Sequence, residues 1–281
     1  MEKVIEVCDL CKTYPAFALD HVSFSIPSGC AAGFIGLNGQ GKTTTIRSIL
    51  NLAKKDSGTV RLMGMDIDRE ERGIKDRLGV VFDEGYLYDS LSMHEMTELV
   101  SGAYMHWDQA TYEDLMKRFD LAEQQRIAGL SKGMRMKYAL TLALSHHAEL
   151  LIMDEPTSGL DPLVRKEVIE MLSQFLGEGG KGVFYSTHIT SDLDKFADVL
   201  VFIHKGRIVF AKDKDELLDT HYVVKGNPAD LTPELRDLFV NLQVNDFGFK
   251  GLTRDVRRVK AAIPTAVFER ANIESIMLAY V

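Results

Sequence analysis

The sequence is poor in cysteine and has no long apolar run. It has three cysteines among 281 residues, Cys8, Cys11 and Cys30. So few cysteines, and an odd number, predict no disulfide framework and indicate a reducing compartment. No run approaches the roughly 18 apolar residues that a membrane-spanning helix needs. We therefore expect a cytoplasmic chain that does not itself cross a membrane.

Basic residues are also scarce relative to acidic ones. The chain has 33 Lys and Arg against 41 Asp and Glu, giving a formal charge of −8. Binding to a nucleic-acid polymer depends on Lys and Arg neutralising its phosphates, so no nucleic-acid partner is expected. A single nucleotide remains compatible, because its phosphates need only a local set of N–H groups, one lysine and a metal ion.

Cys8 and Cys11 form a CxxC pair, but the chain has no second such pair. The surrounding residues predict an edge strand, not the strand-to-helix turn of a redox site. We therefore expect no redox chemistry and no metal site there.

The most informative stretch is GLNGQGKT at residues 36–43. It lies between the apolar run at residues 31–35 and an expected helix, so the GxxxxGK[ST] pattern predicts a P-loop. Its glycines allow positive φ and close approach of a phosphate chain, and Lys42 places a cation beside the phosphates. The alternative, a glycine-rich turn before an ordinary helix, would give Lys42 and Thr43 no role. The residues expected to bind nucleotide in this loop are Gly36, Asn38, Gly39, Gly41, Lys42, Thr43 and Thr44.

Two further features fit a nucleotide site. Asp154 and Glu155 follow four apolar residues and end an expected buried strand, where open α/β sheets bind ligands. One carboxylate can hold Mg²⁺ and its neighbour can orient or deprotonate an attacking water. Tyr14 precedes the P-loop in a turn, where it either stacks on an adenine or covers the sheet edge.

Strands alternate with helices along most of the chain, which predicts an α/β fold. We expect a P-loop NTPase core of mostly parallel sheet with an antiparallel β subdomain, an inserted α-helical subdomain and a small α+β C-terminal appendage. The expected domains are residues 1–220, with the helical subdomain at about 84–147, and residues 221–281. Within the appendage, residues 248–251 are expected to form a loop and residues 273–280 a terminal helix.

Five sequence elements, in this order, resemble the nucleotide-binding domain of ABC transporters. They are the P-loop, LSKGM at residues 130–134 (the signature loop), the segment LIMDEP at 151–156, SGLD at 158–161 and STH at 186–188. The resemblance covers roughly residues 1–218.

The resemblance implies a sandwich dimer that holds ATP between the P-loop of one subunit and the signature loop of the other. Thr43 and Asp154 would then hold Mg²⁺, and Glu155 would be the general base. His188 would contact the γ-phosphate, and Tyr14 would stack on the adenine. Ser131 and Gly133 would reach the partner's γ-phosphate, and Asp161 would lie at the subunit interface.

The chain departs from the family pattern at two places. The usual signature LSGGQ is LSKGM here, which retains Ser131 and Gly133 and introduces Lys132. The loop after residues 78–82 carries Asp83-Glu84 where the family often has a glutamine that senses Mg²⁺ and the membrane partner. A carboxylate can ligate Mg²⁺, so Asp83 is assigned to the metal.

We therefore expect an ATP-hydrolysing subunit of a bacterial exporter, peripheral on the inner face of the membrane. It would work with a separate integral-membrane permease, as a homodimer or as a heterodimer with a related ATPase subunit. The alternatives are a soluble ABC ATPase acting on ribosomes or nucleic-acid machinery, and a slow nucleotide-gated dimerisation module.

Overall fold

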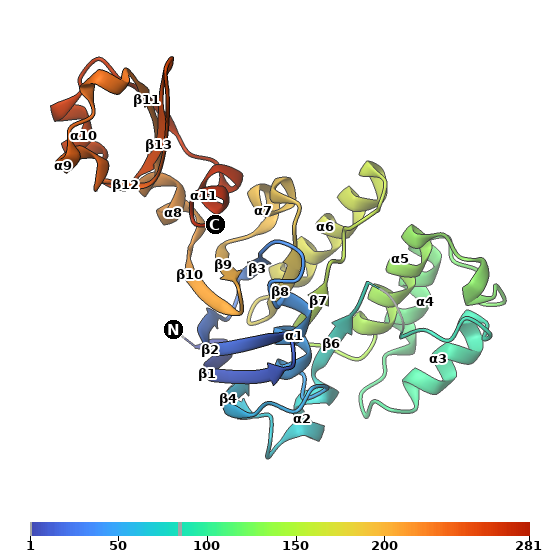
Figure 1. Ribbon diagram of the computed structural model, residues 1–281. Coiled ribbons are helices and arrows are strands. Elements are labelled where there is room, and N and C mark those ends of the chain that lie inside the picture. Colours follow the sequence, from blue (N-terminus) through green and yellow to red (C-terminus); the bar gives the residue numbers. More distant parts are fainter. Residues whose placement is uncertain (1, 84–85) are drawn as a thin grey trace.

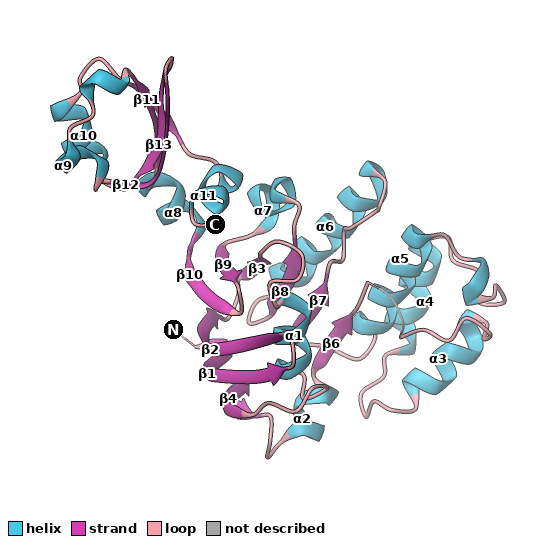
Figure 2. Cartoon of the chain, viewed as in Figure 1, coloured by secondary structure: helices cyan, strands magenta, loops and turns pink. Residues whose placement is uncertain are grey.

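The computed structural model describes residues 2–83 and 86–281 (Figure 1). Glu84 and the predicted start of the helical subdomain, at residue 84, lie outside this described part. Three sheets and their covering helices make up the described chain (Figure 2).

A six-stranded sheet lies at the centre of the ABC-like part of the chain. Its strands in spatial order are β10 (Arg207–Asp213), β9 (Val199–His204), β3 (Ala31–Ile35), β8 (Gly182–Thr187), β7 (Leu150–Asp154) and β6 (Leu78–Val81). All neighbouring pairs are parallel except β10 with β9. Every residue of β3, β7 and β8 is buried, as expected for a parallel sheet covered on both faces. The predicted α/β class with a mostly parallel sheet is confirmed.

Alternate residues of these strands enter two separate hydrophobic clusters. Ile35 and Tyr185 belong to the cluster that also contains buried residues of α6 (Pro162–Gly177) and α7 (Thr190–Phe196). Phe34 and Phe184 stack with ring centroids 5.3 Å apart in the cluster that contains residues of α1 (Lys42–Ile49) and α2 (Glu71–Asp76). Because parallel strands end at one edge, the segments that follow β3, β7 and β8 lie next to one another.

The predicted antiparallel β subdomain is present, and its sheet packs on the α1 side of the core. Its strands in spatial order are β2 (Phe17–Pro27), β1 (Lys3–Tyr14), β4 (Ser57–Leu62) and β5 (Met65–Asp66). The prediction that Cys8 and Cys11 lie in an edge strand is wrong, because β1 pairs with β2 on one side and β4 on the other. The β4 pairing joins residues far apart in sequence, so the local pattern around Cys8 carried no sign of it.

A helical block is inserted between β6 and β7, as the change of periodicity predicted. It contains α3 (Met93–Ser101), α4 (Gln109–Arg118), the 3₁₀ turn η1 (Ile127–Gly129) and α5 (Lys132–Leu144). A capping box between Ser92 and Glu95 starts α3, and the block has a hydrophobic cluster of its own. Within residues 2–83 and 86–281, no helix is long and apolar enough to cross a bilayer.

The C-terminal segment forms a third sheet, antiparallel throughout, with the order β12-β13-β11-β14. Its elements, with the helix that leads into it, are α8 (Lys214–Thr220), β11 (Tyr222–Gly226), η2 (Pro228–Asp230), α9 (Pro233–Arg236), β12 (Phe239–Asn245), β13 (Gly248–Thr253), α10 (Val256–Ala262), β14 (Val267–Arg270) and α11 (Ile273–Ala279). Ile273 and Ile276 of α11 pack in the cluster under the central sheet. The division of the chain at residue 220 stays a prediction.

The expectation of a loop at residues 248–251 is wrong, because this stretch begins the central strand β13. A Cβ on Gly251 would lie 2.5 Å from the Phe239 ring. The glycine that suggested a loop therefore allows close packing between neighbouring strands.

The turn between β9 and β10 provides a stability test. Gly206 has φ of +75°, and a Cβ there would lie 1.9 Å from the Ala18 carbonyl oxygen. Gly29 has φ of +80°, but a Cβ there would have no atom within 4 Å. We expect Gly206→Ala to cost at least about 3 kcal/mol of unfolding free energy, through strain plus a backbone clash. Gly29→Ala should cost only about 1 kcal/mol, through strain alone. Equal losses in chemical denaturation would contradict the clash.

Candidate functional site

The P-loop connects β3 to α1 in the predicted strand-to-helix context. Gly41 has φ of +111°, and a Cβ there would lie 2.7 Å from the Phe17 ring, so the position requires glycine. The buried Lys42 ammonium donates to the Gly36 carbonyl oxygen at 2.8 Å and lies 3.3 Å from Glu155 Oε1. The first N–H groups of α1 have no partner within the helix, so the loop combines free donors with a cation.

A carboxylate pair lies at the end of β7, directly beside the P-loop. Ser186 of β8 donates its hydroxyl to Asp154 Oδ1 and accepts the Glu155 backbone N–H at 2.9 Å. Glu155 has φ of +53°, a strained position for a residue with a side chain. The positioning role of Ser186 escaped sequence reasoning, because it depends on the pairing of β7 with β8.

The Glu155 side chain lies between two other predicted site residues. Its Oε1 faces Lys42, and its Oε2 lies 2.7 Å from His188 Nδ1. Glu155 is 16% exposed, whereas His188 is 47% exposed. The carboxylate is thus fixed in one place with its two oxygens on different partners, which suits a residue that must hold a water in a defined position.

A cavity of about 760 Å³ opens over the P-loop, a size suited to a nucleotide. Eight of the predicted site residues line it: Tyr14, Asn38, Gly39, Gly41, Lys42, Thr43, Thr44 and Glu155. Tyr14 is 43% exposed, and Lys12 Nζ lies 5.3 Å from its ring centroid. The structure therefore brings the expected adenine-stacking aromatic and the phosphate-binding residues into one cavity.

The other seven predicted site residues do not line this cavity: Gly36, Asp83, Ser131, Gly133, Asp154, Asp161 and His188. Ser131 caps α5 by accepting the Met134 N–H at 3.2 Å, and Gly133 packs against Val164, 3.3 Å from where its Cβ would be. Asp161 caps α6 by accepting the Leu163 N–H at 3.0 Å. The part of the site formed by one chain thus lacks the residues that the family resemblance assigns to the partner's nucleotide.

Asp83 also lies outside the P-loop cavity. Its Oδ1 is 2.6 Å from the Lys132 ammonium in the signature loop. Nearby, burial raises the pKa of the Tyr86 hydroxyl, with a smaller contribution from the Asp83 charge. The assignment of Asp83 to Mg²⁺ stays a prediction.

The oxygen donors beside the P-loop suit Mg²⁺. The Thr43 hydroxyl lines the cavity, and the Asp154 carboxylate stands at the end of β7. In nucleotide sites Mg²⁺ is held by one or two protein oxygens, with phosphates and water completing the shell. Among the described residues, no group of three or more His, Cys, Asp or Glu side chains forms a metal cluster.

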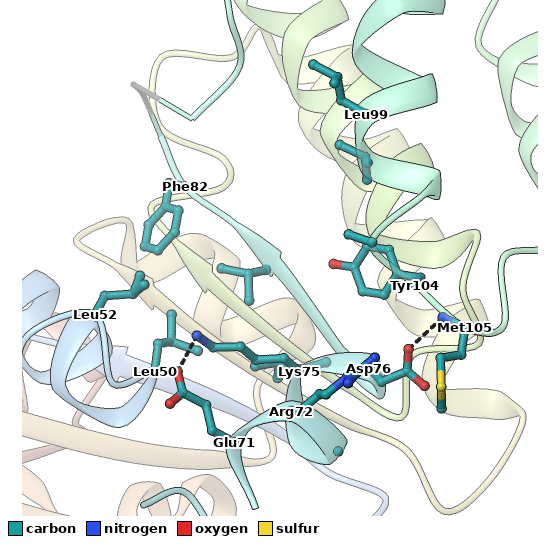
Figure 3. A pocket seen from close by; sticks show the side chains of 15 residues that line it. Leu50, Leu52, Glu71, Arg72, Lys75, Asp76, Phe82, Leu99, Tyr104 and Met105 are labelled. Atoms are coloured by element: carbon teal, nitrogen blue, oxygen red, sulfur yellow. Dashed lines mark hydrogen bonds and ion pairs between the residues drawn. The ribbon is translucent and has the colours of Figure 1, made fainter.

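A second cavity, of about 970 Å³, forms an apolar groove between the central sheet and the helical block (Figure 3). One side carries Leu52 and Phe82, and the other carries Leu99 and Tyr104. Its remaining lining residues include Leu50, Val80, Val100, Ala103 and Met105, with the charged residues Glu71, Arg72, Lys75 and Asp76 of α2. Lys75 pairs with Glu71, and Asp76 accepts the Met105 N–H at 2.9 Å.

Comparison with known proteins places these features in a family. The family model for the ABC transporter matches residues 19–158. The ABC transporter ATP-binding protein NatA of Bacillus subtilis (strain 168) is 32% identical over 209 residues, which cover 72% of this chain and 85% of that protein. The Nod factor export ATP-binding protein I of Paraburkholderia xenovorans (strain LB400) is 30% identical over 295 residues. That alignment covers 99% of this chain and 96% of that protein.

A solved structure of an ATP-binding subunit of an ABC transporter has the same fold. It matches with a TM-score of 0.70 at 29% identity, over 77% of this chain and 92% of that one. The P-loop NTPase fold inferred from the sequence is therefore confirmed.

Ser186 offers a test of how the carboxylates are positioned. We expect Ser186→Ala to lower the rate of ATP hydrolysis by about tenfold, because both Asp154 and the Glu155 N–H lose a partner. ATP affinity should change less than the rate, since Ser186 does not line the nucleotide cavity.

Ser48→Ala is the matched control, because its buried hydroxyl has no hydrogen-bond partner among the described residues. Steady-state hydrolysis and nucleotide titration measure both effects. A rate for Ser186→Ala equal to that of the control would contradict the positioning role.

Proposed function

The chain belongs to the ABC transporter family of ATP-binding proteins, and we propose that two such subunits close around ATP to drive export through a separate membrane permease. Its enzymatic activity is that of an ABC-type ATPase. The proposal of dimer closure rests on one observation. The P-loop cavity contains Lys42 and Glu155, whereas Ser131 and Gly133 lie elsewhere on the same chain. A second subunit, identical or related, would supply them.

The residues around Glu155 indicate how the chemistry would proceed. Phosphate oxygens bound in the P-loop compete with Glu155 for the Lys42 ammonium, which lies 3.3 Å from Oε1. Once Lys42 turns to phosphate, Glu155 is free to accept a proton from the attacking water while His188 holds its second oxygen. Thr43 and Asp154 would hold Mg²⁺, which neutralises charge on the phosphates.

The signature loop would complete the site from the other subunit. The Ser131 oxygen accepts the Met134 N–H, which leaves its hydroxyl proton available to donate to a phosphate. Behind it, α5 runs for 13 residues and directs the positive end of its dipole toward that position. Asp161 caps α6, whose Val164 lies against Gly133, and would lie in the same interface.

We assign the apolar groove to the permease. A short amphipathic helix fits such a surface, with its apolar face on Leu52, Phe82 and Leu99 and its polar face toward the charged residues of α2. Leu50 and Leu52 follow α1, whose first residue is Lys42, so the occupant would contact elements that begin in the ATP site. Binding there would hold the chain at the inner face of the membrane. Export is proposed because one relative whose alignment covers 99% of this chain is a Nod factor export ATP-binding protein.

Glu155→Gln tests dimer closure. The amide keeps the shape of the side chain but cannot take a proton from water, so ATP should persist and hold the subunits together. We expect the variant to elute as a dimer on sizing in ATP and Mg²⁺. Lys42→Ala added to Glu155→Gln should return it to the monomer, because the phosphates lose their buried cation. A Glu155→Gln protein that stays monomeric in saturating ATP would contradict closure.

Leu99→Glu tests the groove. Leu99 is 59% exposed, and Leu278, far from the groove in α11, is 60% exposed, so Leu278→Glu is a matched control. A carboxylate facing an apolar partner segment should weaken association by at least about tenfold. We would compare recovery of the integral membrane protein that co-purifies with the unchanged chain. Equal recovery with both variants would place the permease elsewhere.

A further inference from the structure

The two positions at which the chain departs from its family pattern are in contact with each other. Lys132, which replaces a glycine of the usual signature, places its ammonium 2.6 Å from Oδ1 of Asp83, which stands where a glutamine is usual. Asp83 follows β6, and Lys132 is the first residue of α5, so the pair links the central sheet to the helical block.

Lys132 also lies against the loop that contains Gly159 and precedes α6. A Cβ on Gly159 would be 3.3 Å from its ammonium and 3.4 Å from its Cδ, and Gly159 has φ of +69°. Gly159 belongs to the segment that leads to Asp161, the predicted interface residue. The Lys132 side chain thus crosses this segment on its way from the signature loop to Asp83.

The pair is suited to being broken. The Lys132 and Asp83 side chains are 38% and 35% exposed, although the Asp83 Oδ1 that faces the ammonium is itself buried, and ion pairs between partly exposed side chains contribute little to stability. Lysine is a point charge on a flexible stem, so the ammonium can exchange one anion for another without moving α5. A triphosphate carries more negative charge than one carboxylate and would compete for it.

Lys42 shows the same arrangement on the other half of the site. Its ammonium lies 3.3 Å from the Glu155 carboxylate and is the group that would bind phosphate. Each lysine near the proposed phosphate path thus has a carboxylate partner within its own chain.

We propose that Lys132 binds the phosphates of the ATP held by the partner subunit, and that Asp83 restrains Lys132 until the dimer closes. The inference rests on the proposed dimer, and it adds a phosphate-binding residue between Ser131 and Gly133. It gives Asp83 a role opposite in sign to metal binding. Loss of a restraint favours closure, whereas loss of a metal ligand opposes it.

The test measures the ATP concentration needed for half-maximal dimerisation in the Glu155→Gln background. We expect Asp83→Asn to lower that concentration by about threefold, because Lys132 is released. Lys132→Gln should raise it by about tenfold, because a charge-assisted contact to phosphate is lost. The double variant should match Lys132→Gln, since Asp83 then has nothing to restrain.

Two variants serve as controls. Arg135 and Asp89 form an ion pair of 2.7 Å one turn further along α5, so Asp89→Asn should leave the ATP requirement unchanged. Lys132→Arg keeps the charge and should stay within about threefold of the parent. Thermal melts of each variant check that the fold is retained.

Each result has a distinct consequence. A higher ATP requirement for Asp83→Asn would assign Asp83 to the metal and overturn the restraint. An identical requirement for Asp83→Asn, Lys132→Gln and the parent would make the pair an ordinary surface contact and overturn the inference alone. Failure of the Glu155→Gln parent to dimerise would overturn the proposed function and this inference with it.

Discussion

The contact of Glu155 with Lys42 and His188 depends on the parallel pairing of β3, β7 and β8. That register places Ile35 beside Thr187, and Asp154 beside Ser186, so three segments end together at one edge. Ser186 then fixes the strained turn at Glu155 from the neighbouring strand. A shift of one strand would separate Glu155 from the P-loop.

Features encoded in short segments were predicted from the sequence. The P-loop at residues 36–43 and the terminal helix α11 each depend on neighbouring residues, and the structure has both. Features that depend on pairing between distant segments were not predicted. Pairing between strands that lie far apart in the sequence determines the interior position of Cys8, the strand β13 and the role of Ser186.

The contact between Asp83 and Lys132 belongs to the second group. The sequence marks both positions as unusual, but only the packing of α5 against the end of β6 brings them together. Opposite charges at two altered positions then form one pair, which connects the loop after β6 to the signature loop. In the proposed dimer the P-loop forms one half of the ATP site, and the ion pair of Asp83 with Lys132 lies in the half that the partner subunit would supply.

In the proposed dimer, ATP lies between the P-loop of one subunit and the signature loop of the other. Disulfide trapping tests it directly, using chains whose native Cys8, Cys11 and Cys30 are changed to serine. One chain carries Glu155→Gln with Asn38→Cys, and the other carries Glu155→Gln with Ser131→Cys and a tag of different size. We expect a cross-linked product that contains both chains and forms only when ATP is present. Formation of that product to the same extent without ATP, or no product in saturating ATP, would contradict it.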